Sequence, residues 1–405
     1  MLDKKTIETV KSTAPVLKEH SSEIGKRFYE LLFTKVPDLY NLFNQTNQKR
    51  GIQQEALAYS VYAAGEHIDN LDAIKPVITR VTEKHRAIGV KPEQYPIVGK
   101  TLLEAVKDVL GDAATEDVLI AWGKAYNYIA DAFIEIENNL YEETEKIPGG
   151  WRGFRDFVVD KKVDESDIIT SFYLRPKDGE PIPSYEAGQY LTLNANIKSE
   201  DYNHIRHYSL SDVPGKDYYR ISVKREDSIG DQPPGLVSNY LHNQIQSGDI
   251  LQFSAPAGDF TIKPSNKPLV LLSGGIGITP LLSMLNTTVE KHPNRAIYFI
   301  HATQNSKVHA FKDHVAELAK NHEPVHSYVC YDSPTEEDKQ KHEYDKEGFV
   351  DLDWLKKIVP NNDAEFYLCG SVPFLQAMVR TLNVWGIPKE QIHFEVFNPI
   401  AILGE

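Results

Sequence analysis

The apolar residues of this chain recur with three different periods in three successive segments, and this change of period limits the fold more than any other feature. In residues 1–146 the spacing is helical, and Ile24, Phe28, Leu31 and Leu32 recur at i, i+4, i+7 and i+8. About six to eight such helical stretches are present, which is typical of an all-α domain. The first segment is therefore predicted to be a helical domain.

A second segment, residues 151–262, follows the turn-rich stretch Ile147-Pro-Gly-Gly150. Short β-prone runs, separated by glycine and proline, replace the helical spacing there. Regular short strands of this kind predict a small antiparallel β-barrel. The expected strands are Asp156–Val163, Ile168–Leu174, Gln189–Leu193, His207–Leu210, Tyr219–Val223 and Ile250–Ser254.

In the third segment, residues 266–405, apolar strands alternate with helical stretches at 280–291 and 310–321. This alternation is typical of an α/β domain with a parallel sheet. The expected strands are Leu269–Ser273, Ala296–His301, Val325–Tyr331 and Glu365–Cys369. A chain of 405 residues is too long for one compact core, so we expect a multidomain protein with these three parts in order.

Composition excludes several classes of function. Acidic residues outnumber Lys and Arg by 58 to 44, which disfavours nucleic acid or an anionic membrane as a partner. Cys330 and Cys369 are the only cysteines, so a disulfide framework, a cysteine-rich zinc site and covalently attached c-type haem are excluded. The N-terminus lacks a secretory apolar region, and no apolar run approaches membrane-spanning length. We expect a cytoplasmic monomer that binds small molecules.

The strongest local motif is a buried strand that ends in Ser273-Gly-Gly-Ile-Gly-Ile-Thr279-Pro280. Glycines allow a backbone to approach a pyrophosphate, and N–H groups at the start of a helix bind its oxygens. We expect Thr279 to cap the following helix and Pro280 to occupy its first position. A tight turn without a ligand is the alternative, because the motif is not G-x-G-x-x-G.

Arg206-His-Tyr-Ser209 is a weak pattern alone, but further motifs accompany it in order. They are Ser222-Val-Lys224-Arg-Glu226, Gly235-Leu-Val-Ser238-Asn239, Pro256-Ala-Gly258-Asp-Phe260, the glycine turn, Tyr367-Leu-Cys369-Gly370-Ser371 and Glu395-Val-Phe397. This series resembles the ferredoxin–NADP reductase superfamily over roughly residues 152–400. The resemblance implies an FAD-binding barrel followed by a domain that binds NADH or NADPH.

The same resemblance implies which residues bind the two cofactors. For FAD they are Tyr190, Arg206, His207, Tyr208, Ser209, Gly235, Val237 and Ser238. For the pyridine nucleotide and the ring-stacking end of the flavin they are Gly274, Gly275, Ile276, Gly277, Ile278, Thr279, Cys369, Gly370, Glu395, Val396, Phe397, Asn398 and Pro399. Asn398 departs from the glycine that many relatives carry, which affects the loop near the flavin but not its aromatic residue.

A lone histidine in a helix is more often a surface or satisfied core residue than a metal ligand, so His85 depends on its neighbours. These are Pro37-Asp-Leu-Tyr-Asn-Leu-Phe43, then Gln53 with Leu57 one turn later, Lys84-His85, Tyr95-Pro96, and Ala121-Trp-Gly-Lys-Ala-Tyr126. The set resembles the globin of flavohaemoglobins. It implies haem b with His85 as the proximal iron ligand and Phe43 against the porphyrin. It also implies that Gln53 and Leu57 line the distal face, where Tyr29 hydrogen-bonds bound oxygen.

Tyr95 and Glu137 match the pair of that family that hydrogen-bonds the proximal imidazole. A carboxylate on the far ring nitrogen fixes the tautomer and makes the ligand more electron-donating, which suits oxygen activation. Glu135 is the competitor, but its position two residues away points to another side of the helix. Lys84 and Glu395 match positions that tune electron transfer, with a plain surface charge as the alternative.

The order of globin, flavin barrel and nucleotide domain is that of a flavohaemoglobin, which implies a nitric oxide dioxygenase. NAD(P)H would reduce FAD, FAD would pass single electrons to haem, and O₂ held there by Tyr29 and Gln53 would oxidise NO to nitrate. An O₂ or alkyl hydroperoxide reductase is the enzymatic alternative, and an oxygen sensor or store is the non-enzymatic one. The stretch from His301 to Lys307 has no arginine cluster, which favours NADH.

Overall fold

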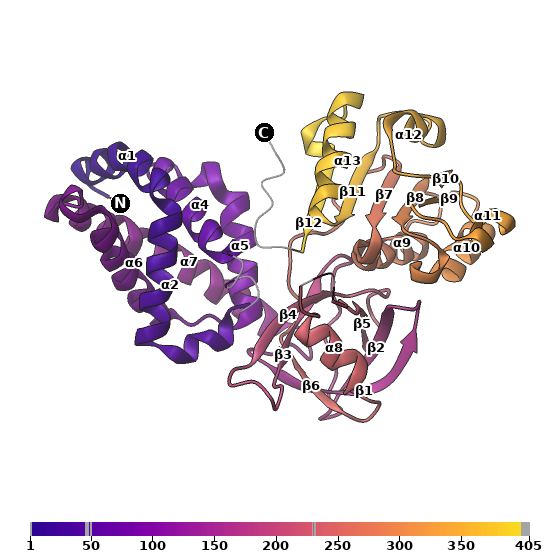
Figure 1. Ribbon diagram of the computed structural model, residues 1–405, viewed down its shortest axis with the longest axis horizontal. Helices are drawn as coiled ribbons and strands as arrows, with labels where there is room; N and C mark the ends of the chain where they lie inside the picture. The colour runs from indigo at the N-terminus through magenta and orange to yellow at the C-terminus, as the bar shows by residue number, and fades with distance from the viewer. Residues whose placement is uncertain (1, 45–47, 49–50, 229, 231, 398–405) are drawn as a thin grey trace. The chain divides into compact units, whose positions relative to one another are not determined.

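A computed structural model describes residues 2–44, 48, 51–228, 230 and 232–397 of the chain (Figure 1). By its internal contacts the chain divides into two compact units. One consists of Met1–Phe154 with Thr192–Arg206, and the other of Arg155–Leu191 with His207–Glu405. No helix among the described residues is both long and apolar enough to cross a membrane.

The N-terminal part is helical, as the spacing of its apolar residues predicts. Asp3 caps the first helix and accepts a hydrogen bond from the backbone N–H of Thr6 at 2.9 Å. The apolar faces of these helices meet around Phe28, Leu32 and Ala125, all of them buried. The elements are α1 (Lys4–Glu19), α2 (Ser21–Lys35), η1 (Pro37–Leu42), α4 (Ile52–Glu66), η2 (Leu71–Ile74), α5 (Lys75–Ile88), η3 (Pro92–Gln94), α6 (Tyr95–Leu110), η4 (Gly111–Ala113) and α7 (Glu116–Lys146).

The middle part is an antiparallel sheet in the order β4-β3-β6-β1-β2-β5. A bridge between Leu210, just after β4, and Ile221 of β5 joins its two edge strands and closes it into a barrel. Phe157, Phe172 and Phe253 fill the interior and are fully buried. The elements are β1 (Arg155–Asp164), β2 (Ile169–Pro176), β3 (Tyr190–Ala195), β4 (His204–Ser209), β5 (Tyr219–Lys224), α8 (Leu236–Asn243) and β6 (Ile250–Phe253).

The C-terminal part is a six-stranded sheet in the order β10-β9-β8-β7-β11-β12, and all of its pairings are parallel. Its first half is β7 (Leu269–Gly274), η5 (Gly275–Gly277), α9 (Ile278–Lys291), β8 (Ile297–Thr303), η6 (Ser306–Val308), α10 (Lys312–Asn321) and β9 (Val325–Tyr331). The second half is α11 (Glu336–Lys341), β10 (Lys346–Glu347), α12 (Leu352–Ile358), β11 (Glu365–Gly370), α13 (Val372–Trp385), η7 (Lys389–Gln391) and β12 (Ile392–Val396).

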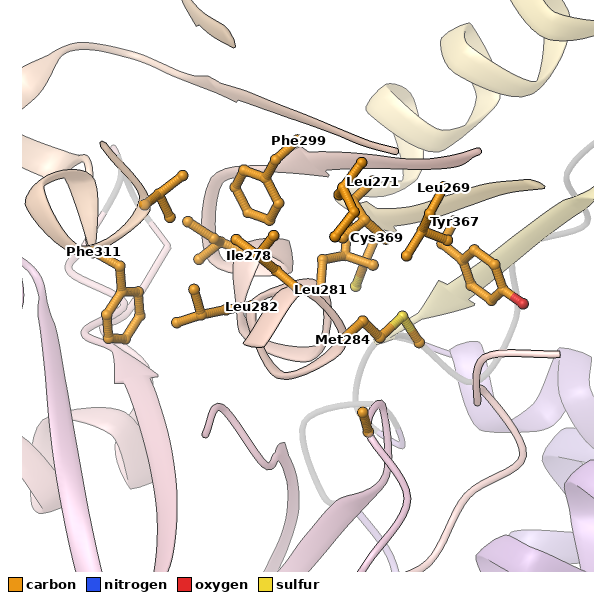
Figure 2. Close-up of a cluster of buried hydrophobic side chains, with 14 of the residues drawn as sticks. Leu269, Leu271, Ile278, Leu281, Leu282, Met284, Phe299, Phe311, Tyr367 and Cys369 are labelled. Atoms are coloured by element: carbon orange, nitrogen blue, oxygen red, sulfur yellow. The ribbon is translucent and has the colours of Figure 1, made fainter. Parts of the chain in front are cut away.

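Helix α9 lies on this sheet through a fully buried face. Figure 2 shows Leu281 of α9 in the same apolar cluster as Leu271 of β7 and Cys369 of β11, and all three are 0% exposed. Burial of this face fixes the helix and therefore the glycine turn that precedes it. The predicted succession of all-α domain, antiparallel barrel and parallel α/β domain is confirmed.

Candidate functional site

The helical part contains a hydrogen-bonded triad of His85, Tyr95 and Glu137, in which the carboxylate is buried and the imidazole is partly exposed. The imidazole Nδ1 of His85 lies 2.7 Å from Glu137 Oε1 and 3.1 Å from the hydroxyl of Tyr95. Tyr95 also donates to the same carboxylate oxygen at 2.6 Å. Glu137 is only 3% exposed, so this carboxylate is held by neighbouring side chains rather than by water.

The triad determines which ring nitrogen of His85 carries the proton. A carboxylate accepts, so Nδ1 must donate; in the neutral ring Nε2 then carries the lone pair, which is the form in which imidazole binds a metal. Tyr95 is fixed in turn, because Tyr126 donates to its backbone carbonyl at 2.8 Å. Burial, and next the charge of Glu137, raises the pKa of the Tyr95 hydroxyl, which therefore stays a donor. With Nδ1 hydrogen-bonded in this way, the lone pair of Nε2 fits the role of a haem iron ligand.

An aromatic cluster surrounds Tyr29, which is 5% exposed on α2. Its ring stacks on Phe33 at 5.7 Å between centroids and meets Phe43 edge-on at 5.5 Å. Leu57 on α4 packs against the same core. The structure thus brings three of the predicted pocket residues into one cluster, whereas the side chain of Gln53 lies outside the described residues.

Next to this cluster is a small apolar cavity of about 20 Å³, roughly the space of one water molecule. It is lined from α1, α2, α4 and α6 by Leu17, Ser21, Ile24, Gly25, Leu57, Val61, Tyr62, Leu102 and Val106. A space of this size and apolar lining suits a small apolar guest better than an ion.

In the barrel the closure between β4 and β5 brings two of the predicted flavin motifs together. Arg206 to Ser209 form the end of β4, and Ser222 to Lys224 form the end of β5. Beside them Tyr190 pairs with Ala257 through two backbone hydrogen bonds, and its ring lies 4.8 Å from that of His207. Tyr208 is half-buried, which leaves part of its ring available for stacking on a flat group.

A third flavin motif forms the start of α8. Ser238 donates to the carbonyl of Gly235 at 3.1 Å and accepts from the backbone N–H of Glu226 at 3.1 Å. Val237 is buried beneath and anchors the turn. This serine therefore ties the loop after β5 to the first turn of the helix, whose N–H groups suit a phosphate.

The glycine turn after β7 requires residues without a side chain at two places. Gly275 has a φ of +54°, in the left-handed region. A Cβ on Gly277 would lie 2.1 Å from the carbonyl oxygen of Cys369 on β11. The prediction that Thr279 caps α9 is wrong: Gly277 is the N-cap, because the 3₁₀ turn continues directly into the helix, and Thr279 instead donates to the Ile276 carbonyl at 3.1 Å.

The remaining residues predicted to bind the nucleotide lie at the carboxyl ends of neighbouring strands. Cys369 pairs with Ser273 of β7 on one side and with Glu395 of β12 on the other. The sheet order reverses between β7 and β11, which is where parallel α/β sheets bind ligands. Gly370 and Val396 form the next register pair.

Burial is the main cause, and the charge of Glu395 the second, of a raised pKa for the Cys369 thiol. This cysteine is therefore a neutral packing group at the carboxyl end of β11. Phe397 is 47% exposed. Asn398 and Pro399 lie outside the described residues. Lys84 is half-buried on α5, in the other compact unit from Glu395.

Several contacts that hold these residues in place were not predicted from the sequence, although Tyr126 belongs to the globin-like motif Ala121–Tyr126. Tyr126 fixes Tyr95, and the Phe133 ring lies 6.2 Å from that of His85. Ser283 of α9 donates to the backbone carbonyl of Asp212 at 2.6 Å. A serine within an apolar helix carries no local signal of such a contact.

Three families match successive parts of the chain. Residues 26–133 match the family described as Globin, 156–262 the Oxidoreductase FAD-binding domain, and 271–380 the Oxidoreductase NAD-binding domain. Two curated proteins named "Flavohemoprotein" are 52% identical over the whole chain. The one from Halalkalibacterium halodurans is itself 98% covered, and the one from Bacillus subtilis 100%. A third, from Rhizobium meliloti, is 44% identical over 98% of this chain and 99% of its own.

Solved structures agree. A flavohemoglobin from Malassezia yamatoensis with bound FAD and heme superposes with a TM-score of 0.84 at 25% identity, covering 98% of this chain and 99% of its own. The FAD/NAD-binding domain of a nitric oxide dioxygenase from Vibrio cholerae is 38% identical, with a TM-score of 0.55 over 60% of this chain and 98% of its own. The chain therefore belongs to the flavohaemoprotein family, and is an NAD(P)H-dependent oxidoreductase with haem and FAD as cofactors.

Proposed function

We propose that this oxidoreductase is a nitric oxide dioxygenase. The reaction is 2 NO + 2 O₂ + NAD(P)H giving 2 nitrate, NAD(P)⁺ and H⁺, so each NO takes up one O₂ and one electron. The observation that carries the proposal is the Glu137 carboxylate on His85 Nδ1 at 2.7 Å. An electron-donating proximal ligand suits oxygen activation, whereas an oxygen store needs neither this carboxylate nor an attached reductase.

When bound, haem supplies an iron that binds diatomic ligands, and FAD converts the two electrons of a hydride into single electrons. We propose that His85 ligates the iron through Nε2 while Glu137 and Tyr95 hold the proton on Nδ1. Tyr29, buried among aromatic rings, would supply a hydroxyl hydrogen-bond donor on the side where a diatomic ligand would bind. Phe43 and Leu57 are proposed to line the same face and keep water out.

For the reductase half we propose that the end of β4 and the start of α8 hold FAD, with Arg206 and the α8 N–H groups facing the diphosphate. The Gly274–Thr279 turn is proposed to receive the nucleotide pyrophosphate. Cys369 and Gly370 follow at the neighbouring strand end, where the nicotinamide would lie. NADH is proposed as the donor, because the chain after β8 has no arginine cluster.

The test is NO consumption by the purified protein with NADH and O₂, followed with an NO electrode together with nitrate analysis. We expect one nitrate per NO and one NADH per two NO. His85→Ala should lose the haem absorption band and NO consumption while keeping FAD and NADH-dependent cytochrome c reduction. If NO disappears no faster than with free haem and flavin, or if alkyl hydroperoxide is reduced much faster than NO is consumed, the dioxygenase assignment is wrong.

We also propose that the protein acts in the cytoplasm as a monomer. Both cysteines are buried free thiols, which suits a reducing compartment. Sedimentation equilibrium should give a mass near the 45.9 kDa of one chain. A mass near twice that value would refute the monomer.

A further inference from the structure

The barrel and the nucleotide domain meet within the second compact unit, and one buried hydrogen bond there links their cofactor motifs. The Ser283 hydroxyl of α9 donates to the backbone carbonyl of Asp212 at 2.6 Å, and Ser283 is 0% exposed. Asp212 lies three residues beyond Ser209, which ends the flavin strand β4. Ser283 lies one helical turn beyond Thr279, which belongs to the nucleotide turn.

The acceptor is itself rigid. Tyr185 of the barrel donates to the same Asp212 carbonyl, also at 2.6 Å, so both lone pairs of this oxygen are used. The Asp212 carboxylate accepts from the hydroxyl of Tyr218 at 2.9 Å and from its neighbour Val213 N–H at 2.8 Å. Movement of α9 against the barrel would therefore break the hydrogen bond from Ser283, because Asp212 is held in place and cannot move with the helix.

A second contact fixes the same junction. Arg220 of β5 lies over the ring of Phe311, which caps α10 of the nucleotide domain, at 5.1 Å from the centroid. Phe311 has a φ of +61° and is 6% exposed. A left-handed non-glycine residue costs about 1–2 kcal/mol, so the packing around it must hold it there. Figure 2 shows Phe311 in the cluster that contains Leu282 and Met284 of α9.

We propose that Ser283 is a positioning residue for hydride transfer between the pyridine nucleotide and FAD. The inference rests on the proposed cofactor sites. In this step the C–H bond of the dihydronicotinamide breaks, the hydride forms a bond to the flavin ring, the nucleotide is oxidised by two electrons and the flavin is reduced by two. Such transfers need the reacting atoms within about 3–3.5 Å, and a misplacement of about 1 Å can cost about 100-fold in rate.

The bond from Ser283 holds the helix that carries one reactant against the strand that carries the other. It contributes nothing to either binding turn directly, because Thr279 and Ser238 make their own local hydrogen bonds. Loss of the Ser283 hydroxyl should therefore slow hydride transfer while leaving both cofactors bound. That split between rate and affinity separates positioning from general stability.

The experiment compares three variants of the full-length holoprotein. Ser283→Ala removes the link between the domains, and Tyr185→Phe removes the other donor to the same carbonyl, from within the barrel. Thr288→Val is the matched control, because among the described residues this buried α9 hydroxyl bonds only to the Met284 carbonyl of its own helix, at 2.8 Å. Anaerobic stopped-flow mixing with NADH and with 4-deuterated NADH follows the flavin absorbance, and hydrogen exchange is measured on the same samples.

We expect Ser283→Ala to lower the limiting rate of flavin reduction about 10-fold or more at unchanged FAD content and unchanged Kd for NADH, with a larger deuterium isotope effect. Amide exchange in the first turns of α9 should rise in Ser283→Ala but not in Tyr185→Phe or Thr288→Val. The proposal is overturned if Ser283→Ala matches Thr288→Val in rate, if it loses FAD, or if its only change is in the Kd for NADH. Because no NO is present, a failed dioxygenase assignment would leave this result unaffected.

Discussion

Glu137→Gln gives the sharpest test of the proximal triad, because it removes one charge and almost no volume. Oε1 of Glu137 accepts from both His85 and Tyr95, at 2.7 and 2.6 Å. Hydrogen bonds to a charged group contribute about 1.5–3 kcal/mol, and neutral ones about 0.5–1.5 kcal/mol. The substitution should therefore weaken the hydrogen bond to the imidazole by about 1.4 kcal/mol. This corresponds to a factor of about 10 in the equilibrium constant that depends on this bond.

A carboxylate on the proximal ligand stabilises ferric over ferrous iron and so lowers the haem midpoint potential. Removal of its charge in Glu137→Gln should therefore raise this potential. For one electron, a factor of about 10 corresponds to about 59 mV. Spectroelectrochemical titration of the haem band measures it. Glu135→Gln is the matched control, since Glu135 is exposed on the same helix two residues away and loses the same charge. Equal shifts in both variants would refute the triad as the cause.

Three further predictions concern Tyr29 on the proposed distal side, the glycine turn before α9, and the buried His309. Tyr29→Phe should speed O₂ dissociation from the ferrous protein about 10-fold, the value of one hydrogen bond, and an unchanged off-rate in flash photolysis would remove Tyr29 from the distal site. Gly277→Ala would place a Cβ 2.1 Å from the Cys369 carbonyl oxygen and should abolish NADH-dependent flavin reduction in the stopped-flow assay. Gly123→Ala is the control and should leave flavin reduction intact, because its Cβ would meet the Leu103 side chain at 3.4 Å. Burial lowers the pKa of His309 from 6.5 to about 3. Below pH 6.5 the unfolded chain therefore binds a proton that the folded chain does not. The free energy of unfolding that is present above pH 6.5 is lost as the pH falls. Between about pH 7.5 and about pH 5.5 this histidine should account for about 1.4 kcal/mol of lost unfolding free energy in urea titrations, and a His309→Gln variant with the same loss would contradict it.

The three-part fold follows from the sequence because each part repeats its own pattern many times. Apolar residues at helical spacing recur throughout residues 1–146, and β-prone runs and βα alternation recur equally often later. A short element such as β10, with two residues, has no such repetition and leaves no pattern to detect. Strand β12, which forms one edge of the sheet, and helix α13 were also not predicted.

The start of α9 shows how local rules fail at a tightly packed glycine turn. Threonine followed by proline is a good signal for a helix start, yet the helix begins earlier. Gly277 can pack directly against Cys369 of β11, and this tertiary contact moves the cap onto the glycine. Local propensity is a weak prior wherever backbone from another strand comes this close.

The sequence by itself determined the fold class and the order of the three parts, because periodicity and motif order depend only on neighbours along the chain. The family resemblance placed Tyr95 and Glu137 beside His85, but only the tertiary structure decided that one oxygen of Glu137, 52 positions from His85, accepts from both His85 and Tyr95. It also decided that Ser283 reaches Asp212 across 71 positions. Contacts between distant positions depend on how the elements pack, and a single sequence carries no periodic signal of them.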